Sequence, residues 1–131
     1  VEMLRAGREG GALTVAITNS ADSPMALAAA HTLPLHAGAE QSVAATKTFV
    51  TSVLAGLALL AEWQDDAALR AAVDGAPQAL AAAVALDWSP LSDRLARAAS
   101  AYVLGRGPAY AIACEAALKM KETSGLHAEA Y

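Results

Sequence analysis

The chain has 131 residues, enough for one ordinary domain, and 56% of them are hydrophobic, with many alanines that predict a helix-rich, closely packed core. Its net charge of −4, the lack of a basic cluster and an aromatic content of only 5% argue against nucleic acid and anionic membranes as partners. The single cysteine, Cys114, cannot form an internal disulfide or a thiol-rich zinc site, so we expect no metal and a reducing, cytoplasmic location.

The first expected elements are the end of a helix and a buried strand. Residues 1–7 read as a helix tail that stops at Gly7, so we expect the chain to be a piece of a longer polypeptide. Residues 12–18 form an apolar, β-branched run that ends in a polar loop, which predicts a buried parallel strand. Residues 32–35 are a weaker strand candidate, in which Pro34 indicates an edge position.

Helices dominate the middle of the chain. Residues 37–42 read as a loop, and Ser42 is a suitable cap for a long helix over residues 43–63. The longest apolar run, residues 49–61, is shorter than the roughly 20 apolar residues that cross a bilayer, so we expect a buried helix and no membrane partner. A second helix is expected over residues 65–86, with a kink or break at Pro77.

The last third of the chain returns to alternating elements. A short helix is expected over residues 90–99, a strand over residues 101–104, and a tight turn over residues 105–108 that opens a helix containing Glu122. Strands that alternate with helices predict an α/β fold with a parallel sheet.

A charged face is expected on that last helix. Lys119 follows Glu115 by four residues, and Glu122 follows Lys119 by three, so the three side chains share one side of the helix. A carboxylate held beside an ammonium group can act as a general base, although most pairs at this spacing are solvated surface pairs.

Three motifs in this order resemble the sugar-isomerase (SIS) domain family, as found in glucosamine-6-phosphate synthases and glucosamine-6-phosphate deaminases. They are AGxExxVAxTKxF over residues 37–49, LGRGxxY over residues 104–110, and ExALKxKExxxxHAEAY over residues 115–131. The resemblance implies a three-layer α/β/α SIS fold with a parallel sheet, in a fragment that spans parts of two SIS domains. It divides the chain into the end of a first domain (1–64), a helical linker (65–89) and the start of a second domain (90–131).

The resemblance also implies the site residues. Glu122 would move a proton between C1 and C2 of an open-chain sugar phosphate, with Lys119 beside it. Val43 would contact the sugar through its backbone, and Ala45 would border the same pocket. No cofactor is implied. Family sites borrow a histidine from a partner subunit, so a homodimer is expected, and the phosphate-binding loop and that histidine would lie outside these residues.

Three functions agree with this resemblance. The first is an isomerase and deaminase that converts glucosamine 6-phosphate to fructose 6-phosphate and ammonia, towards which Ala45 leans because glutamine-dependent synthases often have serine there. The second is the isomerase domain of such a synthase, and the third is a non-catalytic module that binds a phosphosugar. Lys119 and Glu122 count against the third.

Several other residues have simpler interpretations. Glu115 is expected to be a structural partner of Lys119 or Arg106, and His127 to shape the site without acting as its base. Glu129 is expected either to face the cleft or to make a buried hydrogen bond.

Overall fold

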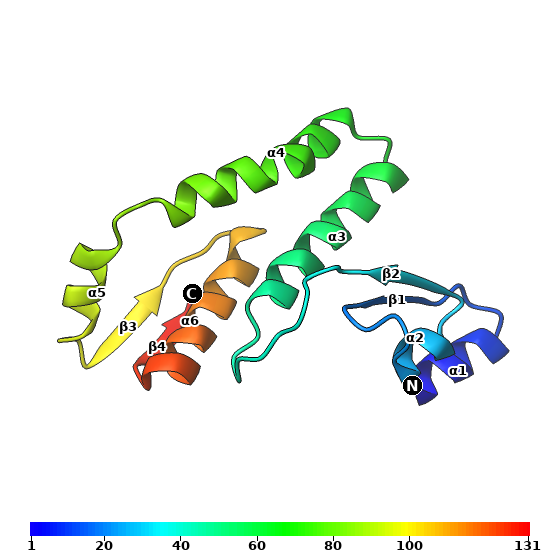
Figure 1. Cartoon of the computed structure of the whole chain (residues 1–131), viewed down its shortest axis with the longest axis horizontal. Helices are drawn as coiled ribbons and strands as arrows, with labels where there is room; N and C mark the ends of the chain where they lie inside the picture. Colours follow the sequence, from blue (N-terminus) through cyan, green and yellow to red (C-terminus); the bar gives the residue numbers. More distant parts are fainter. The chain divides into compact units, whose positions relative to one another are not determined.

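The computed structural model describes all residues from Val1 to Tyr131, and strands and helices alternate along the chain (Figure 1). The chain divides into two compact units, Val1–Leu80 and Ala81–Tyr131, each of which contains a two-stranded parallel sheet. The predicted α/β fold with parallel strands is therefore confirmed. No helix combines the length and the apolar character needed to span a membrane.

The sheet of the first unit pairs β1 (Val15–Thr18) with β2 (His31–Pro34) in parallel, in a register that runs from Val15 opposite His31 to Thr18 opposite Pro34. Helix α1 (Glu2–Glu9) precedes β1, and α2 (Pro24–Ala28) makes the crossover between the strands. Both predicted strands are present. The first helix continues past the predicted stop at Gly7 and ends at Glu9, and the N–H of the following Gly10 bonds to the carbonyl of Ala6.

Helix α2 begins at Pro24, where the predicted polar loop ends, and the sequence analysis predicted no element there. It forms because Ser23 accepts a hydrogen bond from the N–H of Ala26 at 3.2 Å and Pro24 fits the first helical turn. Alanine fills the interior around it, with Ala16, Ala26 and Ala28 all buried. Small side chains let this short helix lie close to the sheet.

Two long helices follow, α3 (Lys47–Trp63) and α4 (Ala67–Val84). The predicted start of the first helix at Val43, with Ser42 as its cap, is wrong: α3 begins at Lys47, after an irregular loop. Of the two alternatives expected at Pro77, a kink or a break, the break is absent, because α4 continues through this residue. Between the helices, Asp66 Oδ1 accepts hydrogen bonds from the N–H groups of Ala68 and Leu69, at 2.9 and 3.0 Å.

The second unit contains α5 (Ser89–Leu95), β3 (Ser100–Val103), α6 (Ala109–Ser124) and β4 (His127–Ala130). Strands β3 and β4 pair in parallel, and α6 connects them and packs against both (Figure 1). The predicted strand and helix are confirmed, whereas β4 was not predicted. Gly125, with a φ of 67°, ends α6 in the left-handed conformation that glycine adopts most readily, and the chain turns directly into β4.

Candidate functional site

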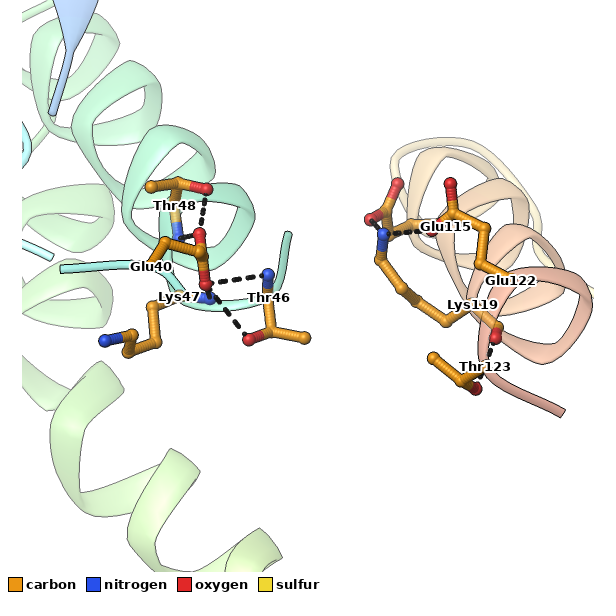
Figure 2. A network of polar contacts seen from close by, with 8 residues as sticks. All are labelled: Glu40, Thr46, Lys47, Thr48, Glu115, Lys119, Glu122 and Thr123. Atoms are coloured by element: carbon orange, nitrogen blue, oxygen red, sulfur yellow. Dashed lines mark hydrogen bonds and ion pairs between the residues drawn. The ribbon is translucent and has the colours of Figure 1, made fainter. Parts of the chain in front are cut away.

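Helix α6 brings together three charged side chains. Lys119 Nζ lies 2.8 Å from Oε2 of Glu122 and 3.1 Å from Oε1 of Glu115 (Figure 2). The side chains of Lys119 and Glu115 are 23% and 21% exposed and that of Glu122 is 39% exposed, so the cluster is partly shielded and Glu122 is its most accessible member. Helical spacing of three and four residues produces this arrangement, as the sequence predicted.

The cluster favours the charged form of the lysine. Its hydrogen bond to Glu122, together with its contacts to Glu115, raises the pKa of Lys119 above the ordinary value of 10.5. Lys119 is therefore a cation at neutral pH, flanked by two carboxylates. A fixed ammonium group beside a carboxylate can hold that carboxylate ionised, or can stabilise negative charge that develops on a bound oxygen.

Two neighbouring carboxylates, Glu115 and Glu129, have defined partners. Glu115 pairs with Lys119, which was one of its two expected partners. Glu129 lies on β4, where Oε1 is 3.6 Å from Nζ of Lys121 and 4.0 Å from Nε2 of His127. The side chain of Glu129 is 46% exposed, so the expected buried hydrogen bond is not observed.

The second group of expected site residues lies in the loop between β2 and α3. Val43 has a fully exposed side chain and Ala45 is also exposed, whereas Ala44 between them is buried at 5% exposure. Ala44 thus anchors the middle of the loop, while its neighbours face outward.

Glu40 organises this loop, a role that the sequence reasoning missed. Its Oε1 accepts hydrogen bonds from the N–H of Thr46 at 3.1 Å, the hydroxyl of Thr46 at 3.2 Å and the N–H of Lys47 at 3.0 Å (Figure 2). Its Oε2 accepts from the N–H of Thr48 at 3.0 Å and from the Thr48 hydroxyl. The carboxylate therefore caps α3 in place of Ser42. A preference for acidic side chains at helix N-termini was the available signal, but a residue seven positions upstream gives no recognisable capping motif.

These contacts set the charge state of Glu40. The hydrogen bond from the Thr48 hydroxyl, followed by those from the backbone of Thr46 and Thr48, lowers the pKa of Glu40 from 4.5 to about 2. The carboxylate is therefore ionised throughout the physiological range, and its negative charge lies at the positive end of the α3 dipole.

Three further hydrogen bonds hold the start of the same loop. Asn19, just after β1, accepts a hydrogen bond from the N–H of Ala37 at 2.9 Å and donates one to the carbonyl of Gly38 at 2.7 Å. Lys47 Nζ donates to the carbonyl of Ala39 at 2.6 Å. The loop is thus attached at the end of a strand and at the first turn of a helix.

Two open depressions lie on the surface, and neither is lined by Val43, Ala45, Lys119 or Glu122. One of about 570 Å³ in the second unit is lined mainly by apolar side chains of α5 and the end of α6, including Trp88, Leu91 and Met120. One of about 390 Å³ in the first unit touches the loop only through Ala37, Thr46 and Lys47. No group of three or more His, Cys, Asp or Glu side chains is arranged to hold a metal ion.

Comparison with known proteins identifies the first part of the chain. The sequence model of the SIS domain matches residues 1–62. These residues belong to the SIS domain family.

Curated relatives extend the similarity over the whole length of the chain. Glutamine–fructose-6-phosphate aminotransferase (isomerizing) of Pyrobaculum aerophilum is 39% identical over 100% of the chain, and that of Zymomonas mobilis is 39% identical over 98% of it. The chain spans 23% of the length of each of these curated relatives.

A solved structure supports the same fold. A protein from Silicibacter pomeroyi DSS-3, described as a candidate phosphosugar isomerase, is 53% identical over 98% of the chain, with a TM-score of 0.91. The match covers 39% of that protein's chain. The parallel α/β architecture is therefore shared with an SIS-type structure.

Proposed function

We propose that this chain is part of a phosphosugar isomerase in which α6 carries the proton-transfer group. The observation that supports this most is Lys119 between Glu115 and Glu122, on a helix of a chain whose relatives are named as isomerizing enzymes. Glu122 is the more exposed of the two carboxylates, and a base must be accessible to its substrate.

The proposed reaction acts on an open-chain sugar phosphate. Glu122 takes the proton from C2, and the C1–C2 double bond forms as the C1 oxygen gains a proton. Glu122 then returns the first proton to C1, while the C2 hydroxyl gives up its proton to solvent and becomes the C2 carbonyl. A single carboxylate on a rigid helix can perform both steps, because C1 and C2 are adjacent. Lys119, which is a cation held 2.8 Å from Glu122, stabilises the charge that develops on the sugar oxygen.

The finer proposal is deamination of glucosamine 6-phosphate to fructose 6-phosphate and ammonia. With an amino group at C2, the same proton transfer yields an imine at C2, and water then releases ammonia. This assignment is supported by Ala45 and by the Silicibacter protein, of which the chain covers a larger share than of the aminotransferases. The solved Silicibacter chain is therefore shorter than the curated aminotransferases. A shorter chain is consistent with SIS proteins that lack the glutamine-hydrolysing domain of a glutamine-dependent synthase.

The second candidate is the isomerase domain of a glutamine-dependent aminotransferase. The names of the curated relatives favour it. Production of glucosamine 6-phosphate from fructose 6-phosphate and glutamine by the full-length protein would establish it, whereas ammonia release from glucosamine 6-phosphate without glutamine would establish the first. A phosphosugar-binding protein without turnover would indicate the regulatory module.

We also propose how the chain is divided into domains, which loop borders the pocket and how many subunits form the site. We infer that residues 1–64 and 90–131 come from two SIS domains joined by residues 65–89, and that the backbone of Val43, with Ala45 beside it, borders the sugar-phosphate pocket. The functional unit is proposed to be a homodimer that contributes a side chain from each subunit.

The decisive experiment replaces Glu122 by Gln in the full-length protein, which preserves the shape and removes the basicity. Exchange of the C1 and C2 protons with solvent should fall by roughly 100-fold or more, the usual scale for loss of a general base. Glu9→Gln, on the exposed surface of α1, is the matched control and should exchange normally. Near-normal exchange in Glu122→Gln would remove Glu122 from the mechanism.

A further inference from the structure

We propose that Glu40 is a positioning residue that holds residues 41–45 in the conformation that binds the phosphosugar. The inference rests on the proposed function, because it assigns how the loop of that site is held. Glu40 is not proposed to touch the substrate; it acts through the backbone that it fixes.

The contacts of Glu40 require a carboxylate. All five groups that meet its two oxygens are donors: the N–H groups of Thr46, Lys47 and Thr48, and the hydroxyls of Thr46 and Thr48. An ionised carboxylate contains only acceptors, so each of its two oxygens can accept from the donors that face it. The amide of glutamine would instead place an NH₂ donor against the donors on one side. The pair Glu40 and Thr46 therefore closes residues 41–45 into a ring (Figure 2).

The other end of the loop is fixed independently. Asn19 hydrogen-bonds to the backbone of Ala37 and Gly38, and Lys47 to the carbonyl of Ala39. Asn19 lies just beyond the carboxyl end of β1, and the loop follows the carboxyl end of β2. Ligands of parallel α/β sheets bind at this edge, so the fixed loop lies where a binding loop is expected.

Glu40 also makes the N-terminus of α3 unavailable as a phosphate-binding site. Free N–H groups at a helix N-terminus are a common phosphate site, but here the carboxylate already occupies those of Thr46, Lys47 and Thr48. The sugar phosphate would have to displace an ionised side chain to bind there. We therefore expect the phosphate to bind elsewhere than at the N-terminus of α3, where Glu40 orders the loop.

When a loop is already ordered before the ligand binds, no binding free energy is lost in ordering it, so the affinity is higher. Loss of Glu40 should therefore weaken substrate binding more than it slows the chemical step. In the full-length protein, Glu40→Ala should raise KM for the phosphosugar by roughly 10-fold, with kcat within about threefold of the wild-type value. Glu40→Gln should show the same direction with a smaller effect, and Glu9→Ala is the control with unchanged constants.

Hydrogen exchange provides a readout that does not depend on activity. Amides of residues 41–48 should exchange faster in Glu40→Ala, whereas those of α6 should not change. Asn19→Ala should raise KM in the same way, because it releases the other end of the loop. If Glu40→Ala is not folded, Glu40→Gln supplies both measurements.

The outcomes distinguish the two proposals. Unchanged KM in an active Glu40→Ala protein, or a fall in kcat with KM unchanged, would overturn the role of Glu40. A wild-type protein that neither binds nor converts phosphosugars would overturn the proposed function. In that case, faster exchange at residues 41–48 would still support Glu40 as the residue that orders the loop, and unchanged exchange would refute it.

Discussion

Lys119 and Glu115 lie one turn apart on α6, and Lys119 Nζ is 3.1 Å from Glu115 Oε1 while it also donates to Glu122. One ammonium group therefore neutralises one of two carboxylates, and the cluster as a whole is negative. Glu115 holds Lys119 through a contact separate from that with the proposed base. The position of the ammonium group is thus fixed by two contacts rather than one.

Replacement of Lys119 by Met tests this arrangement. Methionine keeps much of the side-chain length but removes the cation that contacts both Glu115 and Glu122. We expect proton exchange at C1 and C2 to fall by roughly 10- to 100-fold, because the charge that develops on the sugar oxygen loses its stabilising ammonium group. Exchange rates of the two proteins at neutral pH check this, and an unchanged rate in Lys119→Met would argue against an electrostatic role for Lys119.

Glu115→Gln should have a milder effect. The lysine then keeps its contact with Glu122, so the base remains paired, but the side chain loses its second anchor. We expect less than about 10-fold loss of exchange rate, with KM for the phosphosugar nearly unchanged. A loss as large as that of Glu122→Gln would identify Glu115 as a second essential carboxylate.

The capping carboxylate predicts acid sensitivity of α3. The pKa of Glu40 is about 2 in the folded protein, below its unfolded value near 4.5. Its contribution to stability is therefore complete above pH 4.5 and is lost as the pH falls towards 2. The melting-temperature difference between wild type and Glu40→Gln should be constant from pH 7 to 5 and shrink below pH 4.5. A difference independent of pH would contradict this interpretation.

Two glycines should respond to alanine in opposite ways. A Cβ atom on Gly105 would lie 2.5 Å from the carbonyl oxygen of Ala109 and 2.8 Å from Cβ of Ala113, so the turn before α6 would have to move. We expect Gly105→Ala to destabilise the protein by about 1–3 kcal/mol. Gly75→Ala in α4 meets no atom within 4 Å and should stabilise by up to about 1 kcal/mol. Chemical denaturation of the two variants checks both signs, and equal effects would contradict the close packing at Gly105.

Dimerisation is the final prediction. Of the residues in the long apolar helix α3, only Ala61 is fully buried, and Leu59, Leu60 and Trp63 are exposed within the described chain. Apolar surface of this kind requires cover from other parts of the protein or from a second copy. Light scattering of the full-length protein should give the mass of a dimer, and a stable monomer would contradict the prediction.

The sequence was informative where a short-range pattern determines the structure. The β-branched run before Asn19 predicted β1, and spacing of three and four residues predicted the face of α6 that carries Lys119. The crossover α2 and the strand β4 were not predicted. Strand β4, His-Ala-Glu-Ala, has low β-propensity and is a strand because β3 pairs with it across an intervening helix.

The hydrogen bonds of the loop between β2 and α3 also could not be predicted from the sequence. Ser42 has the usual type and position of a cap, yet Glu40 caps α3 because the intervening loop folds back on itself. Asn19 meets the loop from a distance of 19 residues in sequence, through contact with Gly38. Contacts of this kind depend on chain reversals that no local motif encodes.

The ring closed by Glu40 and Thr46 makes the length of this segment matter more than its composition. Added or deleted residues between them would pull the carboxylate off the helix, whereas exchanges at Gln41, Ser42, Val43 and Ala45 alter only outward-facing side chains. In a library of variants, substitutions there should survive and insertions should not. If the proposed function holds, variation of this segment at constant length is the way to redirect the protein towards other sugars.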